Sequence, residues 1–164
     1  MNFSSIKEYF YKLGNRCYFL VLLPLAVFIY LFRQLMTSQM EPMIKDEPLV
    51  YIIIAIMTAF ALVNLTTVHG IAKRRLKKYS AEVGLGRKLD RYHEIVMFRI
   101  AASSASSLMM AAGLLLTGSE LFGLLFIGIL LWTPLQWPTA RRACRDLQLK
   151  GDEYDMVFYK KDGF

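Results

Sequence analysis

The sequence is poor in two residue types on which many secreted and metal-binding domains depend. Its 164 residues include two cysteines and two histidines. Small secreted domains held by disulfides carry many more cysteines, and a structural zinc site takes four ligands. The composition therefore excludes a disulfide-rich module and predicts no metal site. Cys17 and Cys144 are expected to remain reduced, because both adjoin predicted cytoplasmic membrane boundaries.

The chain also lacks the short motifs of common catalytic sites. It contains no Cys-x-x-Cys, His-Glu-x-x-His, Gly-x-Ser-x-Gly or phosphate-binding glycine loop. Arg87 and His93 have an Arg-x5-His spacing similar to one in a class of prokaryotic ribonucleases, but an arginine-rich segment produces this match by chance. We therefore expect neither enzymatic activity nor a cofactor. A nuclease that uses these two residues is kept as a third hypothesis.

Charged residues are absent from four long stretches. Residues 17–32, 48–72, 100–119 and 121–140 contain no Asp, Glu, Lys or Arg, and together they make up about half of the chain. An α-helix needs about 20 apolar residues to cross a hydrocarbon layer of roughly 30 Å. These stretches exclude a disordered chain and a soluble enzyme domain. They predict a protein that lives in a membrane.

The predicted fold is an all-α membrane protein with four transmembrane helices arranged as two helical hairpins. A short amphipathic helix precedes the first span, and a small cytoplasmic tail follows the last. The predicted segments are an amphipathic lead-in (1–16), the first span (14–36), an extracytoplasmic loop (37–47), the second span (48–69), a basic cytoplasmic loop (70–99), the third span (100–117), a tight extracytoplasmic turn (118–120), the fourth span (121–138) and the tail (139–164).

The first span is extended by Arg16 and Arg33, whose long side chains can reach the headgroup layer from each end. Pro24 lies inside it, and membrane helices tolerate such a proline. A signal peptide is the rival interpretation of this region. The residues after Phe32 lack a small-x-small cleavage site, so we expect the helix to stay in the mature protein.

Local signals mark the ends of the predicted helices. Ser5-x-x-Glu8 has the spacing of a capping box at the start of the lead-in, whose apolar residues are expected to lie in the headgroup layer. Between the last two spans, Gly118 can close one helix, while Ser119 can cap the next and Glu120 favours its N-terminus.

Basic residues are distributed unevenly between the predicted sides of the membrane. Of the 20 Lys and Arg residues, 18 lie in the lead-in, the basic loop and the tail, and two lie on the other side. Because basic residues mark the cytoplasmic side, the N-terminus, the C-terminus and the central loop are predicted to be cytoplasmic. A bacterial inner membrane is the simplest location.

The basic loop is predicted to contain two helices. The second span continues to about Tyr79, the chain breaks near Gly84-x-Gly86, and a helix over 87–99 leads into the third span. Its positive charge predicts contact with anionic lipid headgroups, and no nucleic acid is expected. The headgroup candidates are Lys73, Arg74, Arg75, Lys77 and Lys78.

The tail is predicted to begin with a helix over 141–150 that Gly151 closes. Residues 154–159 alternate imperfectly and predict a short strand that pairs with 147–149. The tail is too short to form its own core. We therefore expect it to dock on the basic loop, on lipid or on another chain.

The third span differs from the others because small residues line it on every face. Pairs such as Ala101 with Ala105 and Ser103 with Ser107 have the small-xxx-small spacing that lets helices approach closely. The main interpretation is helix packing, and the alternative is an oligomer seam or a polar pore. The packing or pore candidates are Thr58, Asn64, Ala101, Ser103, Ser104, Ala105, Ser106 and Ser107.

Two functions are weighed from these features. The absence of ionisable residues within the spans argues against an autonomous proton-coupled transporter. The first hypothesis is a non-catalytic accessory or scaffold subunit of a membrane complex, with a protein partner or self-association. The alternative is a small homo-oligomeric channel or permease lined by the third helix.

Overall fold

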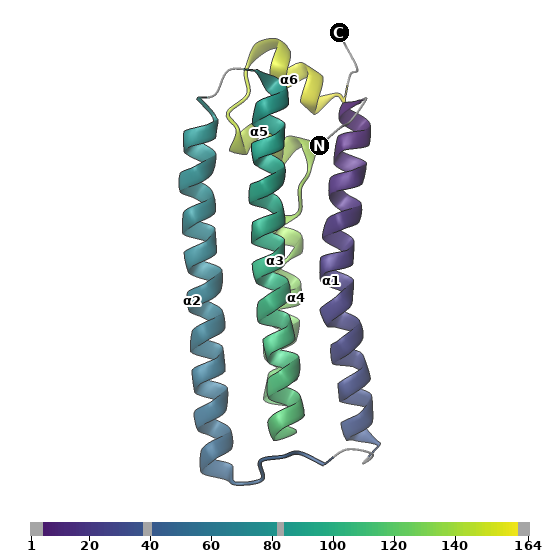
Figure 1. Ribbon diagram of the computed structural model, residues 1–164, viewed down its shortest axis with the longest axis vertical. Helices are drawn as coiled ribbons and strands as arrows, with labels where there is room; N and C mark the ends of the chain where they lie inside the picture. Colours follow the sequence, from purple (N-terminus) through teal and green to yellow (C-terminus); the bar gives the residue numbers. More distant parts are fainter. Residues whose placement is uncertain (1–4, 38–40, 82–83, 161–164) are drawn as a thin grey trace.

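The computed structural model describes residues 5–37, 41–81 and 84–160, and every regular element in these ranges is a helix. Three long helices and a shorter fourth helix run side by side, and two small helices cover one end (Figure 1). In chain order, the elements are α1 (Ile6–Met36), α2 (Glu47–Tyr79), α3 (Leu85–Thr117), α4 (Leu121–Trp132), the 3₁₀ turn η1 (Pro134–Gln136), α5 (Ala140–Asp146) and α6 (Gly151–Phe158).

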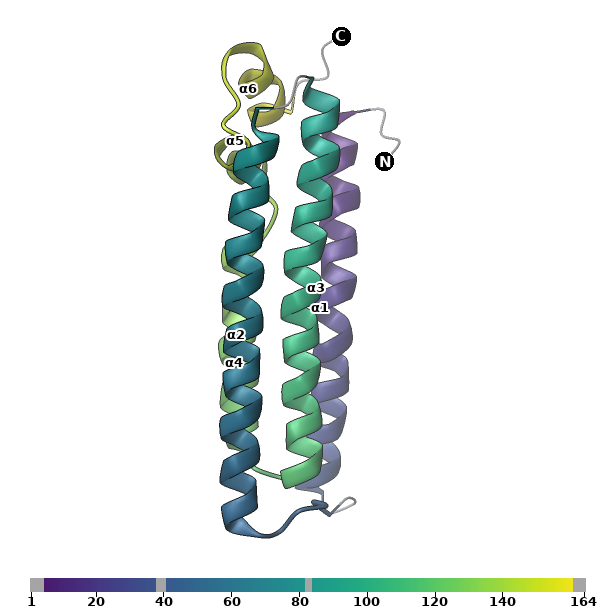
Figure 2. The ribbon, with the colours of Figure 1, turned by 60° about the vertical axis from the view of Figure 1, so that its left-hand side comes forward.

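Helix α3 is the centre of the bundle, and α1, α2 and α4 all pack against it (Figure 2). In its most apolar 18-residue window, 56% of the residues are buried, against 11% for α1 and 6% for α2. Each of these three helices is long and apolar enough to cross a membrane. Since α1 and α2 leave most of their apolar surface uncovered, lipid or another protein must cover it.

Helices α3 and α4 approach each other closely because α3 has a glycine at the contact. A Cβ atom on Gly113 would lie 2.3 Å from the ring of Phe122, which is completely buried. Gly118 ends α3 in the left-handed conformation with φ of 64°, as predicted. The predicted cap at Ser119 is wrong: Glu120 occupies the N-cap position of α4, and no side chain caps that end.

Helices α2 and α3 are longer than a membrane is thick. Each has 33 residues and is therefore about 50 Å long, whereas the hydrocarbon layer measures roughly 30 Å. The predicted continuation of α2 to Tyr79 is confirmed. The predicted break is also confirmed, because Gly84 precedes α3 with φ of 97°.

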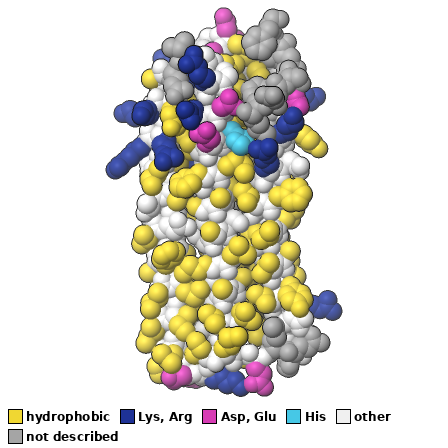
Figure 3. Space-filling view, viewed as in Figure 1, with side chains coloured by type: hydrophobic (Ala, Val, Ile, Leu, Met, Phe, Trp, Pro, Cys, Tyr) yellow, Lys and Arg dark blue, Asp and Glu magenta, His cyan; other side chains and the backbone are white. Residues whose placement is uncertain are grey.

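One end of the bundle carries most of the charge. We call this end, formed by residues 6–16, 70–81, 84–99 and 139–160, the basic end. Basic side chains gather around it, and a largely uncharged, apolar band follows below (Figure 3). Two separate groups of buried apolar residues match this division, one inside the basic end and one inside the apolar band.

The first of these cores joins four parts of the chain. Leu13 from α1, Leu76 from α2 and Val96 from α3 pack together with Leu147 and Val157 from the tail. The tail therefore docks on the other helices of the same chain. The Tyr9 hydroxyl donates a hydrogen bond to the backbone carbonyl of Leu89 (2.7 Å), and this bond ties α1 to α3.

A separate interfacial helix over 1–16 is not present among the described residues, because α1 is continuous from Ile6 to Met36. The predicted N-cap is confirmed: the Ser5 side chain accepts a hydrogen bond from the Glu8 backbone. The apolar residues at the start of α1, which include Tyr9 and Leu13, are buried against other parts of the protein. They need no headgroup layer to cover them.

The segment predicted as a fourth span, 121–138, is interrupted in the structure. Its α-helix has 12 residues, and η1 follows it before the chain bends by 77° into α5. Pro134 and Pro138 explain the interruption, since proline cannot donate the backbone hydrogen bond that a continuing helix needs. One face, with Phe122 and Phe126, is buried, while Leu124 and Leu131 are exposed.

The predicted strand over 154–159 is wrong, because Gly151–Phe158 is a helix. The predicted helix over 141–150 already ends at Asp146, and Gly151 begins the next helix instead of closing that one. Gln148 adopts a left-handed φ of 51° and turns the chain back. Asp152 and Glu153 then occupy the first turn of α6, where acidic side chains favour a helix.

A candidate anion-binding pocket at the basic end

A pocket of about 360 Å³ lies where α2 and α3 leave the apolar band and meet α5. We call it the basic pocket. Asp146 is the sole carboxylate among its described lining residues, against five permanently positive side chains and one histidine. The positive and titratable side chains in its wall are His69, Lys73, Lys77, Arg99, Arg142 and Arg145.

Helix α2 supplies one wall of the basic pocket. His69, Lys73 and Lys77 are spaced four residues apart, so they follow one another along one face of the helix. Ala72 and Leu76 lie beside them, are buried, and anchor this face in the core of the basic end. Neither Lys73 nor Lys77 forms an ion pair with any residue that the structure describes, so their charges are available to a ligand.

Arg99 forms the floor of the basic pocket. It is 6% exposed, and its Nε donates a hydrogen bond to Gln136 Oε1 (3.3 Å). Its Nη1 lies 4.0 Å from Asp146 Oδ2, while Arg145 Nε lies 3.6 Å from Asp146 Oδ1. One carboxylate is thus shared between two guanidinium groups, and a net positive charge remains in the wall.

Helix α5 places Arg142 and Arg145 beside α2 because the chain bends after η1. The Thr139 side chain accepts a hydrogen bond from the Arg142 backbone (3.2 Å) and so caps α5. The Arg142 guanidinium donates to the carbonyl of Leu135, which orients it. Burial raises the pKa of the Cys144 thiol on the inner face of α5, which favours its unreactive protonated form.

A partly enclosed, positively charged pocket of this kind fits an anion. Guanidinium and ammonium groups bind phosphate oxygens through charge-assisted hydrogen bonds. Basic pockets at the cytoplasmic ends of membrane helices bind anionic lipid headgroups. The arrangement can therefore hold a phosphate group.

The five headgroup candidates from the sequence divide into two groups. All five are exposed, but Lys73 and Lys77 line the basic pocket, whereas Arg74, Arg75 and Lys78 lie outside it. Arg75 instead lies over the ring of Phe98, 5.9 Å from its centre. Sequence analysis missed His69, Arg99, Arg142 and Arg145 as partners in one site. Their spacing along the chain carries no signal, because only the bend after η1 brings α5 to α2.

The serines predicted for packing or for a pore are buried within the bundle. Ser103, Ser104, Ser106 and Ser107 are all at most 9% exposed. Asn64 Nδ2 donates to Ser106 Oγ (3.0 Å) and so joins α2 to α3.

Three further packing or pore candidates, Ala101, Ala105 and Thr58, do not share the buried, hydrogen-bonded surroundings of Ser106. Ala101 and Ala105 are exposed on the outer face of α3. The buried Thr58 hydroxyl has no hydrogen-bond partner among the described residues.

Arg87 and His93 lie on different faces of α3. They are six positions apart, so their side chains leave the helix in directions about 120° apart. Arg16 Nη1 lies 3.4 Å from His93 Nε2. No group of three or more His, Cys, Asp or Glu side chains in the described ranges could hold a metal ion.

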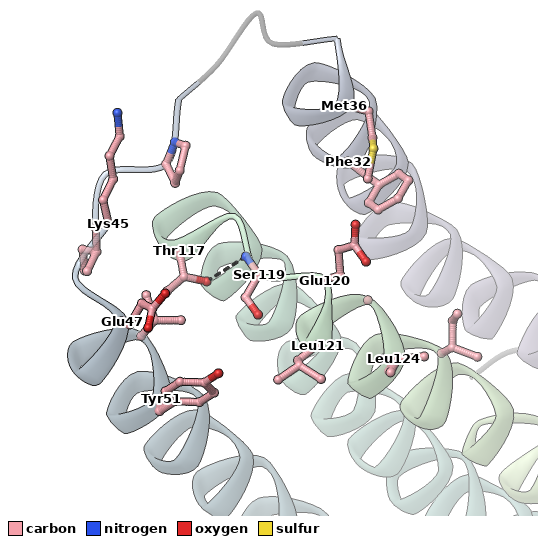
Figure 4. Close-up of a pocket in the computed structure, with 15 residues that line it drawn as sticks. Phe32, Met36, Lys45, Glu47, Tyr51, Thr117, Ser119, Glu120, Leu121 and Leu124 are labelled. Atoms are coloured by element: carbon pink, nitrogen blue, oxygen red, sulfur yellow. Dashed lines mark hydrogen bonds between the residues drawn. The ribbon is translucent and has the colours of Figure 1, made fainter.

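A larger pocket of about 880 Å³ lies at the opposite end, between α1, α2 and α4 (Figure 4). Its wall is mostly apolar and includes Phe32, Tyr51 and Leu124. Glu47 and Glu120 add negative charge there, but Lys45, the basic residue of this wall, already pairs with Glu41 (2.5 Å). The described lining residues of this pocket carry two carboxylates and one paired lysine, too few charges to indicate a particular ligand.

Comparison of the chain with protein-family models, with curated proteins and with solved structures finds no match. The chemistry of the basic pocket is therefore inferred from its own residues.

Proposed function

We propose that the protein is a multi-pass, non-catalytic accessory or scaffold subunit of a membrane complex. The observation that carries this proposal is the continuous core of the basic end, which joins α1, α2, α3 and the tail. The long helices α2 and α3 run without interruption from the apolar band into this folded, charged unit. Such a unit offers a partner a rigid surface, as an accessory subunit must.

The proposed topology has four crossings. Helix α4 packs against α3 and runs back toward the basic end, where α5 and α6 lie near the start of α1 (Figure 1). Residues 121–136 would be about 24 Å long as a helix, close to the hydrocarbon thickness. Trp132 and Trp137 suit the interface at the end of this segment.

The protein is proposed to lie in the cell inner (plasma) membrane, with the basic end facing the cytoplasm. Basic residues are strongly concentrated there, and such residues are retained on the cytoplasmic side during insertion. With four crossings, both termini are cytoplasmic.

The burial of the third helix favours a scaffold over a pore. A channel along Ser103, Ser106 and Ser107 needs their hydroxyl groups to face water, whereas these side chains are buried among the helices of one chain. The uncovered faces of α1 and α2 give a partner ample apolar surface.

Purification in a mild detergent followed by cross-linking and mass spectrometry tests this proposal. We expect a partner or a second copy to be recovered in fixed stoichiometry, with cross-links to lysines of the basic end. Recovery of the chain as a lone monomer would contradict the accessory role. The channel alternative predicts solute flux in liposomes that Ser106→Leu abolishes.

A further inference from the structure

A second, apolar pocket lies directly below the basic pocket, between α2 and α4. It has a volume of about 280 Å³, and we call it the α2–α4 groove. Helix α2 contributes Leu62 and Leu65, while α4 contributes Gly128 and Trp132. The two helices scarcely touch each other, so the space between them is not closed by their own packing.

The groove and the basic pocket share one face of α2. Leu65 lines the groove, and His69, four residues later on the same face, lines the basic pocket. Residues 11 positions apart lie about three turns apart on the same face of a helix. Leu62 in the groove therefore lies in line with Lys73 in the basic pocket, and Leu65 lies in line with Leu76. One face of α2 therefore changes from apolar to cationic along its length.

The other wall shows the same change. Gly128, Ile129 and Trp132 of α4 border the groove, and Gln136 in the next turn holds Arg99 on the floor of the basic pocket. Above them, α5 adds Arg142 and Arg145. Both walls thus pass from apolar to basic at the level where the uncharged stretches end.

We propose that the α2–α4 groove and the basic pocket form one binding site for an anionic glycerophospholipid. The headgroup phosphate binds Lys73, Lys77 and the arginines above, and one acyl chain fills the groove. Charge complementarity selects an anionic headgroup, since the pocket wall has five permanent positive charges and one carboxylate. The apolar groove favours a lipid over a soluble phosphate, because a soluble phosphate has no acyl chain to bury in the groove.

Gly128 gives this proposal a specific test. A Cβ atom on Gly128 meets no other atom within 4 Å, so a larger side chain would extend into open space beside the groove. Gly128→Leu should fill the volume of the acyl chain without a clash inside the protein. It leaves every charge of the basic pocket in place.

The experiment measures lipid adducts on the purified chain by native mass spectrometry, with dioleoyl phosphatidylglycerol, dioleoyl phosphatidylcholine and glycerol 3-phosphate as probes. We expect one phosphatidylglycerol per chain, with at least about tenfold preference over phosphatidylcholine. Lys73→Gln with Lys77→Gln should weaken phosphatidylglycerol binding by about 10- to 30-fold, from the loss of two nearby charges. Gly128→Leu should weaken it by at least about fivefold.

The matched control is Arg74→Gln with Lys78→Gln, which removes the same charge from the same helix outside the pocket. It should change phosphatidylglycerol binding less than about twofold. An equal loss of phosphatidylglycerol binding in the control variant would overturn the proposal, because it would indicate a diffuse electrostatic attraction to all the basic residues of α2. Equal binding of phosphatidylcholine would also overturn it. Tight binding of glycerol 3-phosphate, unaffected by Gly128→Leu, would replace it with a site for a soluble anion.

The proposal rests on placement in a membrane and not on the accessory role. Lipid binding is measured on the isolated chain, so a missing protein partner leaves this result unchanged. A failure to bind phosphatidylglycerol leaves the accessory role standing.

Discussion

Two glycines, Gly113 and Gly128, lie in opposite surroundings within the bundle. Gly113 on α3 has no room for a side chain, because the ring of Phe122 occupies the space where its Cβ atom would lie. Gly128 on α4 borders open space next to the α2–α4 groove. The same residue type is thus required for close helix contact at one position and leaves room for a ligand at the other.

The first prediction compares these glycines. Gly113→Ala should destabilise the bundle by about 1–3 kcal/mol, because the buried Phe122 ring must move or adopt a strained rotamer. Gly128→Ala should be neutral or slightly stabilising, since it adds helix propensity without a clash. Thermal unfolding in detergent measures both variants. Equal melting temperatures for the two would contradict the close α3–α4 contact.

The second prediction concerns Asp146, the carboxylate shared by Arg99 and Arg145. Asp146→Asn should lower the stability of the chain by about 1–2 kcal/mol. This is less than the loss expected for a fully buried ion pair, because the carboxylate is partly exposed and its contacts are long. The same change raises the positive charge of the basic pocket. It should therefore tighten binding of phosphatidylglycerol while it lowers the melting temperature without lipid. Weaker lipid binding would show that Asp146 orients the arginines more than it neutralises them.

At the scale of elements, α6 packs on the bundle through apolar side chains that include Val157, and an ion pair joins it to α3. Val157 is fully buried in the core of the basic end. Lys88 Nζ on α3 lies 2.7 Å from Glu153 Oε2 on α6, and the Lys88 side chain is 12% exposed. A helix of eight residues is not stable alone, so these contacts decide whether α6 forms.

The third prediction is that Val157→Asp releases α6 from the bundle. A carboxylate in that position would be buried without a partner, which is strongly unfavourable. Cys144, whose Sγ lies 3.9 Å from the carbonyl of Tyr154, should then become accessible. Maleimide labelling of Cys144, resolved by peptide mass spectrometry, should become at least about tenfold faster, because the native thiol is buried and its pKa is raised.

The control for this variant is Tyr159→Asp, which adds the same charge at an exposed position at the end of α6. Labelling of Cys144 should keep its native rate in that protein. If Val157→Asp also keeps the native rate, α6 does not cover Cys144 in solution.

At the scale of the whole molecule, length and charge decide how the bundle sits in a membrane. Helices α2 and α3 are longer than the hydrocarbon layer, and their excess lies at the basic end. The interrupted segment that begins with α4 is the shortest of the proposed crossings, because its α-helix has 12 residues. Whether it crosses determines the side on which the tail lies.

The fourth prediction uses reporters to count the crossings. In a bacterial host, green fluorescent protein fused after Phe164 should fluoresce, and alkaline phosphatase fused at Ser119 should be active, because the proposed topology puts the turn outside and the tail inside. Active phosphatase and dark green fluorescent protein at the C-terminus would indicate three crossings. That result would also place the α5 residues of the basic pocket away from α2.

Much of the helical framework could be predicted from the sequence. The ends of α2 and α3 near Tyr79 and Gly84 follow from local signals, and so does the cap at Gly118. Cys17 and Cys144 are both buried and free in the structure. The tail was mispredicted because residues 154–159 mix apolar and polar side chains without a clear period, so that docking on the core decides their conformation.

The long uncharged stretches determined, without any structure, that this chain has helices able to span a membrane, because an α-helix satisfies its backbone polar groups within a single stretch. Only the tertiary structure decided which cations share a pocket. Lys73 and Arg142 are far apart in the sequence, and they line the same pocket because the chain bends after η1 and brings α5 to α2. Local patterns record periodicity and caps, whereas a binding site depends on long-range contacts that no short stretch of sequence contains.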